Sequence, residues 1–169
     1  EISQPPPPIN VTSLQISNNG QYILVGTDSD VHYLYDAFDL KPIRRLTGHR
    51  PLGKNSGEEV SFTADSRYVV SGSAEGGVYF WSLPADKLDA AETDANGKVV
   101  KAAKTLQADV VIHSSDPSVR FTSRVVKFNP RFSVLAVGGE ELVSWRDRRR
   151  RFANGLVVLA AGAGRGGED

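Results

Sequence analysis

The sequence predicts an all-β fold, a partial β-propeller with about three blades of a larger ring. Three stretches, residues 13–36, 59–82 and 125–145, share one apolar skeleton. Within each stretch, apolar and polar residues alternate with period two and are interrupted by turn residues, which is typical of consecutive antiparallel strands. Each unit also repeats a large apolar residue, a glycine and a strand-closing aromatic. These are Ile16, Phe62 and Phe128, then Gly26, Gly72 and Gly138, then Tyr35, Trp81 and Trp145.

The order of segments along the chain follows from composition. Residues 1–10 hold four consecutive prolines, which lock φ and remove hydrogen-bond donors, so we expect a Pro-rich extended lead-in. Residues 11–145 then form three blades, at about 11–47, 58–112 and 120–145. A polar loop insertion interrupts the second blade near 84–103. The remainder, 146–169, is an Arg/Gly-rich low-complexity tail.

Two apolar runs allow more than one interpretation. The runs around Val99 and Val110 to Ile112 are candidates for the outer strand of the second blade, or for a short helix, and periodicity does not decide between them. The run from Leu156 to Ala161, within the tail, could add a strand to an open sheet edge.

The number of blades predicts an incomplete ring. Propellers contain about four to eight blades of about 40–45 residues each, and only three are found here. The end blades are therefore expected to expose apolar faces and strand edges. Because the chain starts at Glu1 and contains no Met, we expect a fragment or a processed protein.

Composition excludes several function classes. Lys plus Arg and Asp plus Glu number 20 each, so no overall charge draws the chain to nucleic acid or a membrane. The absence of cysteine excludes disulfides, thiolate zinc sites and cysteine nucleophiles. No apolar run is long enough to cross a bilayer and no signal-peptide pattern is present, so no membrane partner is expected.

Sequence motifs for catalysis or cofactor binding are incomplete. Residues 48–55 approach a phosphate-binding loop, but Asn55 replaces the metal-binding Ser or Thr. Residues 162–167 match the glycine pattern of dinucleotide-binding sites, but the sequence shows no following helix to bind the pyrophosphate. The histidines His32, His49 and His113 have no metal-ligand spacing. We therefore predict no catalytic residues, no metal, no cofactor and no small-molecule substrate.

The pair Gly48-His49, ahead of the second unit, resembles the Gly-His dipeptide of WD repeats. The resemblance implies a structural hydrogen-bond network in which His49 bonds Ser71, and Ser71 in turn meets Trp81. Glu75 stands where the family usually has Asp, and Ser82 replaces the Asp that follows the closing Trp.

A closer resemblance covers roughly 11–83 and 120–145. The strings DAF (36–38), VSFTADSRYVVSGSAEGGVYFW (60–81) and KFNPRFSVLAVGGEELVSW (127–145) are similar to the last blades of the WD-repeat subunit shared by the COMPASS histone methyltransferase complex and the cleavage and polyadenylation factor. The resemblance implies a non-catalytic nuclear scaffold. Its expected partners are protein subunits of those two complexes, in histone methylation, mRNA 3′-end processing and transcription termination.

Partner contacts are expected on the loops at the propeller rim, which present side chains on a rigid platform. The candidates are Arg50 and Lys54 after the first blade, and Arg120 and Phe121 before the last. The tail carries a basic cluster, Arg148, Arg149, Arg150 and Arg151, that could contact an acidic partner or nucleic acid. The alternative function is therefore a nucleic-acid-binding protein that uses this Arg-rich tail on a propeller platform.

Overall fold

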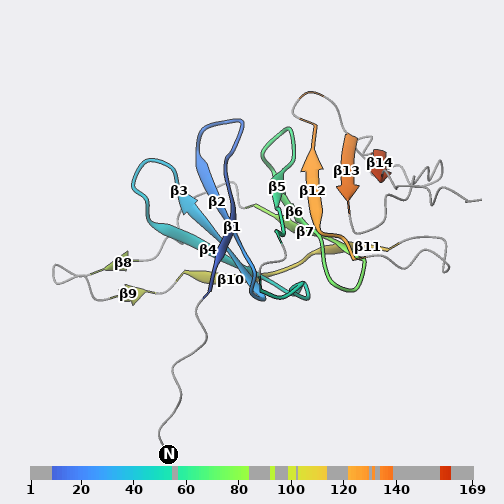
Figure 1. Ribbon diagram of the computed structural model, residues 1–169. Helices are drawn as coiled ribbons and strands as arrows, with labels where there is room; N and C mark the ends of the chain where they lie inside the picture. Colours follow the sequence, from blue (N-terminus) through green and yellow to red (C-terminus); the bar gives the residue numbers. More distant parts are fainter. Residues whose placement is uncertain are drawn as a thin grey trace, which may run out of the picture.

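The chain folds into β-sheets placed side by side (Figure 1). The computed structural model describes residues 9–54, 57–83, 92–93, 99–101, 103–113, 122–129, 131, 134–138 and 157–160. Every regular element in these ranges is a strand, which confirms the predicted all-β class. The Pro-rich lead-in up to residue 8, most of the 84–103 insertion and most of the tail lie outside the described residues.

The first sheet is an antiparallel meander with a fifth strand at its outer edge. Its order is β1-β2-β3-β4-β10, and β10 runs parallel to β4. The Leu106 pairing with Leu46 sets this register, so a segment distant in sequence covers the edge of β4. The strands are β1 (Val11–Ile16), β2 (Tyr22–Thr27), β3 (Val31–Asp36), β4 (Pro42–Thr47) and β10 (Lys104–Gln107).

The second sheet has the order β11-β7-β6-β5 and is fully antiparallel. Its outer strand, β11, comes from the apolar run at Val110 to Ile112, one of the two candidates that the sequence offered. The other candidate, around Val99, forms β9 and pairs with β8 in a separate ribbon. The strands are β5 (Ser61–Phe62), β6 (Tyr68–Ser71), β7 (Val78–Ser82), β11 (Val110–Ile112), β8 (Glu92–Thr93) and β9 (Val99–Lys101).

The third sheet combines an antiparallel pair with a strand from the tail. Its order is β12-β13-β14, where β12 is Val125–Phe128, β13 is Val134–Gly138 and β14 is Val157–Ala160. Strand β14 pairs in parallel with β13, so the apolar run of the tail does add a strand to this sheet edge. The predicted third strand of this blade, closing at Trp145, lies outside the described residues.

Two apolar cores lie between neighbouring sheets. The first joins the first and second sheets and contains Tyr22, Leu24, Leu34, Ile43, Leu46, Val60, Phe62, Val69, Tyr79 and Trp81. The second joins the second and third sheets and contains Val70, Val78, Phe80, Val126, Leu135 and Val137. The middle sheet therefore buries both of its faces, because alternate residues along its strands point to opposite neighbours. This face-to-face stacking of sheets is the arrangement of adjacent propeller blades.

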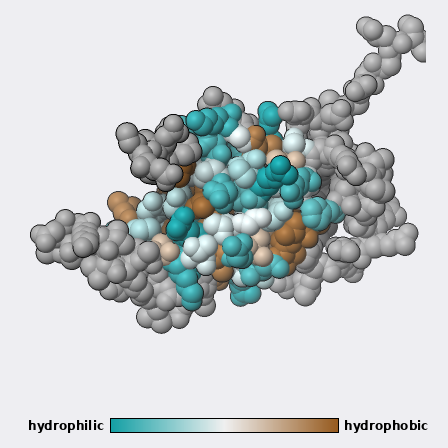
Figure 2. Space-filling model, turned by 90° about the horizontal axis from the view of Figure 1, so that it is seen from below, coloured by the Kyte–Doolittle hydropathy of each residue, from teal (hydrophilic) through white to brown (hydrophobic). Residues whose placement is uncertain are grey.

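The turns between strands gather at two opposite ends of the sheets. One end, which we call the upper rim, carries turns 17–21, 37–41 and 63–67, and here Asn18 Nδ2 donates to the Ala64 carbonyl at 3.0 Å. The opposite end, the lower rim, carries turn 28–30, residues 48–54 after β4 and turn 72–77, and here the Ala74 N–H bonds the Arg50 carbonyl at 2.9 Å. Figure 2 views the molecule from below and shows a mainly hydrophilic surface with separate hydrophobic areas.

Candidate functional site

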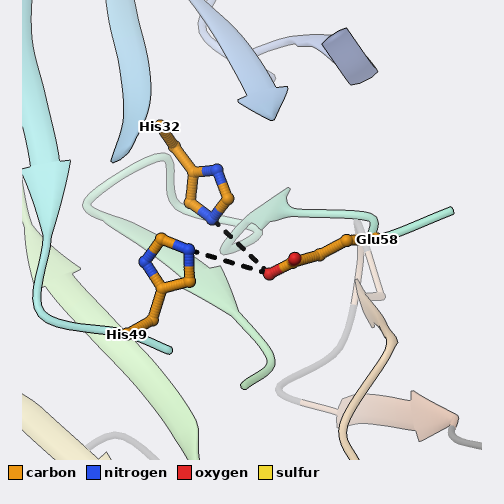
Figure 3. Close-up of side chains that lie close together, drawn as sticks. All are labelled: His32, His49 and Glu58. Atoms are coloured by element: carbon orange, nitrogen blue, oxygen red, sulfur yellow. Dashed lines mark ion pairs between the residues drawn. The ribbon is translucent and has the colours of Figure 1, made fainter. Parts of the chain in front are cut away.

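Three ionisable side chains are buried just inside the lower rim, between the first and second blades (Figure 3). His32 lies on β3, His49 follows β4 and Glu58 precedes β5. His32 shares a strand face with Leu34, so the period-two alternation that buries Leu34 also directs the imidazole into the blade interface. Both rings point toward Glu58, and each Nε2 lies 3.8 Å from Glu58 Oε1.

Hydrogen bonds fix the protonation of His32. The Thr27 backbone N–H donates to His32 Nδ1 at 3.2 Å, so Nδ1 carries no proton. The proton of the neutral ring is therefore on Nε2, which donates to Ser71 Oγ at 3.0 Å. Burial, and next the charge of neighbouring His49, hold the pKa of His32 well below its ordinary value of 6.5. His32 is thus a neutral imidazole that joins a strand of the first blade to a strand of the second.

His49 stacks on His32. The two ring centroids are 4.1 Å apart with an interplanar angle of 18°. His49 Nε2 donates to the Ser29 carbonyl at 3.1 Å, while its buried Nδ1 has no hydrogen-bond partner. Burial lowers the pKa of His49 below 6.5, and the bond to Ser29 opposes this shift. A neutral pair of rings avoids two adjacent buried charges.

Glu58 completes the cluster as a carboxyl group with reduced acidity. Burial raises its pKa from 4.5 to about 7, although hydrogen bonds from the Leu52 backbone and the Ser71 hydroxyl act in the opposite direction. The Ser71 hydroxyl, whose oxygen accepts from His32, lies 3.3 Å from Glu58 Oε1 and 3.2 Å from the Gly72 carbonyl. Glu58 Oε2 is buried with no hydrogen-bond partner. Below its raised pKa the carboxyl is protonated, which removes the cost of a buried charge.

The three side chains offer metal-ligand atoms that all lie within 4.8 Å of one another. Two imidazoles and one carboxylate are a ligand set suited to zinc or iron. His32 does not fit that role in this arrangement, because the Thr27 N–H occupies Nδ1 and Nε2 carries the proton donated to Ser71. His32, Ser71 and Glu58 are all sealed from solvent, so their polar atoms face one another across the boundary between the two blades.

The predicted network of His49, Ser71, Trp81 and Glu75 is only partly assembled. Ser71 bonds His32 rather than His49, and the Trp81 indole N–H donates to the Thr47 carbonyl at 2.8 Å. The ring of Trp81 meets the edges of both imidazoles, with centroids 6.1 Å from His32 and 5.9 Å from His49. Glu75 stays at the surface, where it pairs with Arg50 at 3.3 Å. The histidine beside Ser71 is therefore the one from β3.

Only some of the other predicted site residues lie among the residues that the structure describes. Arg50 and Lys54 lie on the loop of the lower rim, both exposed. Tyr35 is half-buried on the side of β3 opposite Leu34. The positions outside the described residues are Arg120, Phe121, Trp145, Arg148, Arg149, Arg150 and Arg151.

Sequence reasoning missed His32 and Glu58 as members of this cluster. A signal for His32 was present, because a polar residue on the same strand face as Leu34 is expected to be buried. The signal for Glu58 was weaker, since adjacent Glu58 and Glu59 look alike in sequence. In the structure Glu58 is fully buried, while Glu59 binds Lys127 Nζ at 2.6 Å. Only the spatial meeting of two blades distinguishes the two carboxyls.

Comparison with known proteins matches one repeat of the chain to a family model. The family model described as WD domain, G-beta repeat, matches residues 40–82, which include His49, Ser71 and Trp81. Among the described residues, no helix is long and apolar enough to serve as a membrane span.

The chain is similar to several curated WD-repeat proteins. It is 30% identical to WD repeat-containing protein 82 of Drosophila melanogaster over 79% of this chain and 35% of that protein. It is 28% identical to COMPASS component SWD2 of Saccharomyces cerevisiae over 75% of this chain and 35% of that protein. It is 22% identical to Set1 complex component swd2 of Schizosaccharomyces pombe over 83% of this chain and 44% of that protein. The chain thus spans less than half the length of these relatives. With its stacked antiparallel sheets and its matched repeat, the chain is a WD40 repeat protein related to WD repeat-containing protein 82 and SWD2.

Proposed function

We propose that this chain is part of a non-catalytic scaffold subunit of a nuclear histone methyltransferase complex of the COMPASS type. The observation that carries the proposal is its similarity, over 75% and 83% of its length, to two yeast proteins named as components of COMPASS and of the Set1 complex. A second expected role is in mRNA cleavage and polyadenylation and in transcription termination, as a subunit shared with that machinery. The partners are protein subunits of these complexes.

The buried cluster supports a scaffold rather than an enzyme. His32, Ser71 and Glu58 are each 0% exposed, so their polar atoms are used in joining blades and are not presented to a substrate. The described residues hold no second group of three metal-ligating side chains. Binding is therefore expected at the rims, where turns project from a rigid stack of sheets.

The lower rim offers a defined contact surface. The Arg50 side chain is 70% exposed and pairs with the 49% exposed carboxylate of Glu75. Its backbone is held in place, because the Arg50 N–H donates to Ser73 Oγ at 3.1 Å and the Arg50 carbonyl accepts from Ala74. A fixed backbone with an exposed charged pair is suited to specific recognition of a partner protein, since little ordering is needed on binding.

Affinity purification from nuclear extract, followed by mass spectrometry, tests the proposal. The wild-type chain is compared with Arg50→Glu, with Glu75→Arg and with the double exchange. The matched control reverses the exposed pair Lys41 and Asp39 on the opposite rim, whose charged atoms lie 3.8 Å apart. We expect methyltransferase and polyadenylation-factor subunits with the wild type and the control, and reduced recovery with either single reversal.

Two results would contradict the proposal. If both single reversals recover every complex subunit as well as the wild type does, the lower rim is not part of the binding surface. Recovery only of nucleic acid, released by added salt and abolished by deletion of residues 146–169, would instead assign the function to the Arg-rich tail.

A further inference from the structure

The β1–β2 turn of the first blade and the β5–β6 turn of the second blade repeat the same hydrogen bonds, 46 residues apart. The Ser17 hydroxyl donates to Asn19 Oδ1 at 2.7 Å. The equivalent Thr63 hydroxyl donates to Asp65 Oδ1 at 2.6 Å. In each turn the backbone N–H two residues after the acceptor donates to the same oxygen, at 3.1 Å. The two turns therefore use Oδ1 in the same way, although one side chain is an amide and the other a carboxylate.

The backbone of the two turns is equivalent as well. Gly20 and Ser66, which follow the acceptor residues, both have a left-handed backbone, with φ of 70° and 57°. Their N–H groups each donate to the carbonyl of the residue three positions earlier, at 2.9 Å. The side-chain nitrogen of Asn19, by contrast, donates to Gln21 Oε1 at 3.4 Å, a long hydrogen bond between exposed groups. The turn thus depends on the oxygen of the Asn19 side chain far more than on its nitrogen.

Asn19 and Gly20 form the residue pair in which deamidation of asparagine is least hindered, because glycine places no side chain beside the attacking nitrogen. Both residues are exposed, and beyond the adjoining residues no heavy atom lies within 4 Å of where a Gly20 Cβ would stand. In this reaction the Gly20 backbone nitrogen attacks Asn19 Cγ, the Cγ–Nδ2 bond breaks, and the backbone amide proton leaves with Nδ2 as ammonia. Water then opens the cyclic imide at Cγ, which gives aspartate, or at the main-chain carbonyl, which gives isoaspartate. A water molecule is consumed, ammonia is released, and no oxidant or reductant is needed.

The folded turn opposes the first step of this reaction. The Gly20 N–H donates to the Ser17 carbonyl, so the attacking nitrogen must first leave a hydrogen bond of 2.9 Å. Asn19 Oδ1 is held by its two donors, and the Asn19 N–H donates to Ser66 Oγ of the second blade at 3.3 Å. Closure of the imide ring moves Cγ onto the Gly20 nitrogen and is incompatible with all of these bonds together. The reaction therefore proceeds from a locally opened turn, and the population of that open state limits its rate.

We propose that Asn19 is a site of spontaneous deamidation, at which opening of the β1–β2 turn controls the rate and the aspartate product fits back into the same turn. Asp65 shows how that product is accommodated, because its carboxylate oxygen accepts from the Thr63 hydroxyl and from a backbone N–H. The isoaspartate product does not fit, since it lengthens the main chain by a methylene group within the turn. Conversion to aspartate places a negative charge on the upper rim, where the Asn19 N–H joins the first blade to Ser66 of the second.

The rate of ammonia loss tests the control by the turn. The full chain is incubated at mildly alkaline pH, both native and unfolded in guanidinium chloride, and peptide mass spectrometry with fragmentation follows residue 19. The pairs Asn96-Gly97 and Asn154-Gly155 are scored separately. We expect Asn19 to convert in the native chain at least about tenfold more slowly than in the unfolded chain. The matched control is Gly20→Ser, which copies Ser66 of the second blade and should slow the conversion under both conditions, because a side chain hinders the attack.

A second measurement tests whether the product fits. Asn19→Asp is compared with Asn18→Asp, because Asn18 Nδ2 donates to the Ala64 carbonyl at 3.0 Å and a carboxylate cannot make that bond. We expect Asn19→Asp to keep the wild-type midpoint of urea unfolding and the slow hydrogen exchange of the Gly20 amide. Asn18→Asp should lower the midpoint. The isoaspartate form, separated by chromatography from aged wild-type protein, should lose the protection of the Gly20 amide.

Three results would overturn the proposal. Equal rates of conversion in the native and the unfolded chain would show that the turn does not control the reaction. Absence of conversion in the native chain, after many half-lives of the unfolded chain, would show that the folded protein is not modified at Asn19. Loss of Gly20 amide protection in Asn19→Asp would show that the turn does not accept aspartate at this position, despite the precedent of Asp65.

Discussion

His32 donates a hydrogen bond to Ser71 across the boundary between two blades, at 3.0 Å, although the residues are 39 positions apart in sequence. Both side chains are completely buried. The bond therefore couples β3 of the first blade to β6 of the second at a place that water does not reach. Buried polar contacts of this kind specify how blades are aligned, because a misaligned partner leaves an unsatisfied group in the interior.

Replacement of this histidine should destabilise the protein strongly. In His32→Ala the Thr27 N–H loses its acceptor, the Ser71 oxygen loses the donor from His32, and a cavity forms against Trp81. We expect a loss of about 2–5 kcal/mol in the free energy of unfolding, measured in urea. His113→Ala, at an exposed position, is the matched control and should change it by less than about 0.5 kcal/mol. Equal effects would show that the inter-blade bond contributes nothing.

Truncation of Trp81 should have a comparable effect through packing. The ring is 0% exposed, stacks on Tyr79 with centroids 6.3 Å apart, and touches both histidines at their edges. We expect Trp81→Ala to lower the free energy of unfolding by about 3–5 kcal/mol. Trp81→Phe keeps part of the ring but loses the bond to the Thr47 carbonyl, so its loss should be smaller. Equal protease sensitivity of Trp81→Ala and wild type would refute the central placement of this ring.

The pH dependence of stability should depend on Glu58. Its pKa is raised from 4.5 to about 7. Between these two pH values the Glu58 carboxyl of the folded protein holds a proton that the unfolded chain has released. Stability from this group is therefore lost as the pH rises through the window. Glu58→Gln should remove this loss, measured by urea unfolding at a series of pH values. Glu75→Gln, at an exposed carboxyl, is the matched control, and an unchanged profile in Glu58→Gln would contradict the burial of this charge.

The histidines should produce the opposite slope in the same measurement. The pKa values of His32 and His49 are lowered below 6.5, so the unfolded chain takes up protons that the folded protein does not. Their contribution is present above pH 6.5 and is lost as the pH falls below it. In Glu58→Gln this acid-side loss should remain and become easier to resolve. If the free energy of unfolding of that variant did not fall below pH 6.5, protonation of the two imidazoles would not destabilise the folded protein.

Two equivalent glycines should respond differently to the same substitution. A Cβ added at Gly72 would overlap the backbone carbonyl of Ser123, which a side-chain movement does not relieve. At Gly138 the nearest atom would be Val125 Cβ, at an ordinary 3.9 Å. We expect Gly72→Ala to cost about 2–3 kcal/mol or more and Gly138→Ala to cost less than about 0.5 kcal/mol, by urea unfolding. Similar costs would mean that the second and third blades are not packed this closely.

The repeat pattern predicted most of the fold because it is local. Alternation in the units around Ile16 and Phe62 predicts strands and turns, and the shared glycine and aromatic positions predict stacked blades. Sequence did not predict the parallel pairing of β10 with β4 or of β14 with β13. These pairs join segments far apart in the chain, and short apolar runs do not reveal which edge they will meet.

The candidate site was harder to predict, because its members come from three separate places. His49 was found from the dipeptide that it forms with Gly48, but the partner of Ser71 proved to be His32. Which histidine bonds Ser71 depends on the position of β3 relative to the second blade, and the spacing of residues in the sequence does not give that position. Glu58 acquires its raised pKa only when the two blades come together around it.

The covering of β4 by β10 has a consequence for how the protein is made. Residues 44–47 pair with residues 104–107, so the outer edge of the first sheet stays open during synthesis until the later segment has left the ribosome. Until then the nascent chain exposes an unpaired strand edge that can recruit other chains. When β10 arrives, β11 follows directly along the chain and closes the edge of the second sheet. One short stretch of polypeptide thus finishes two blades in a single late step of biosynthesis.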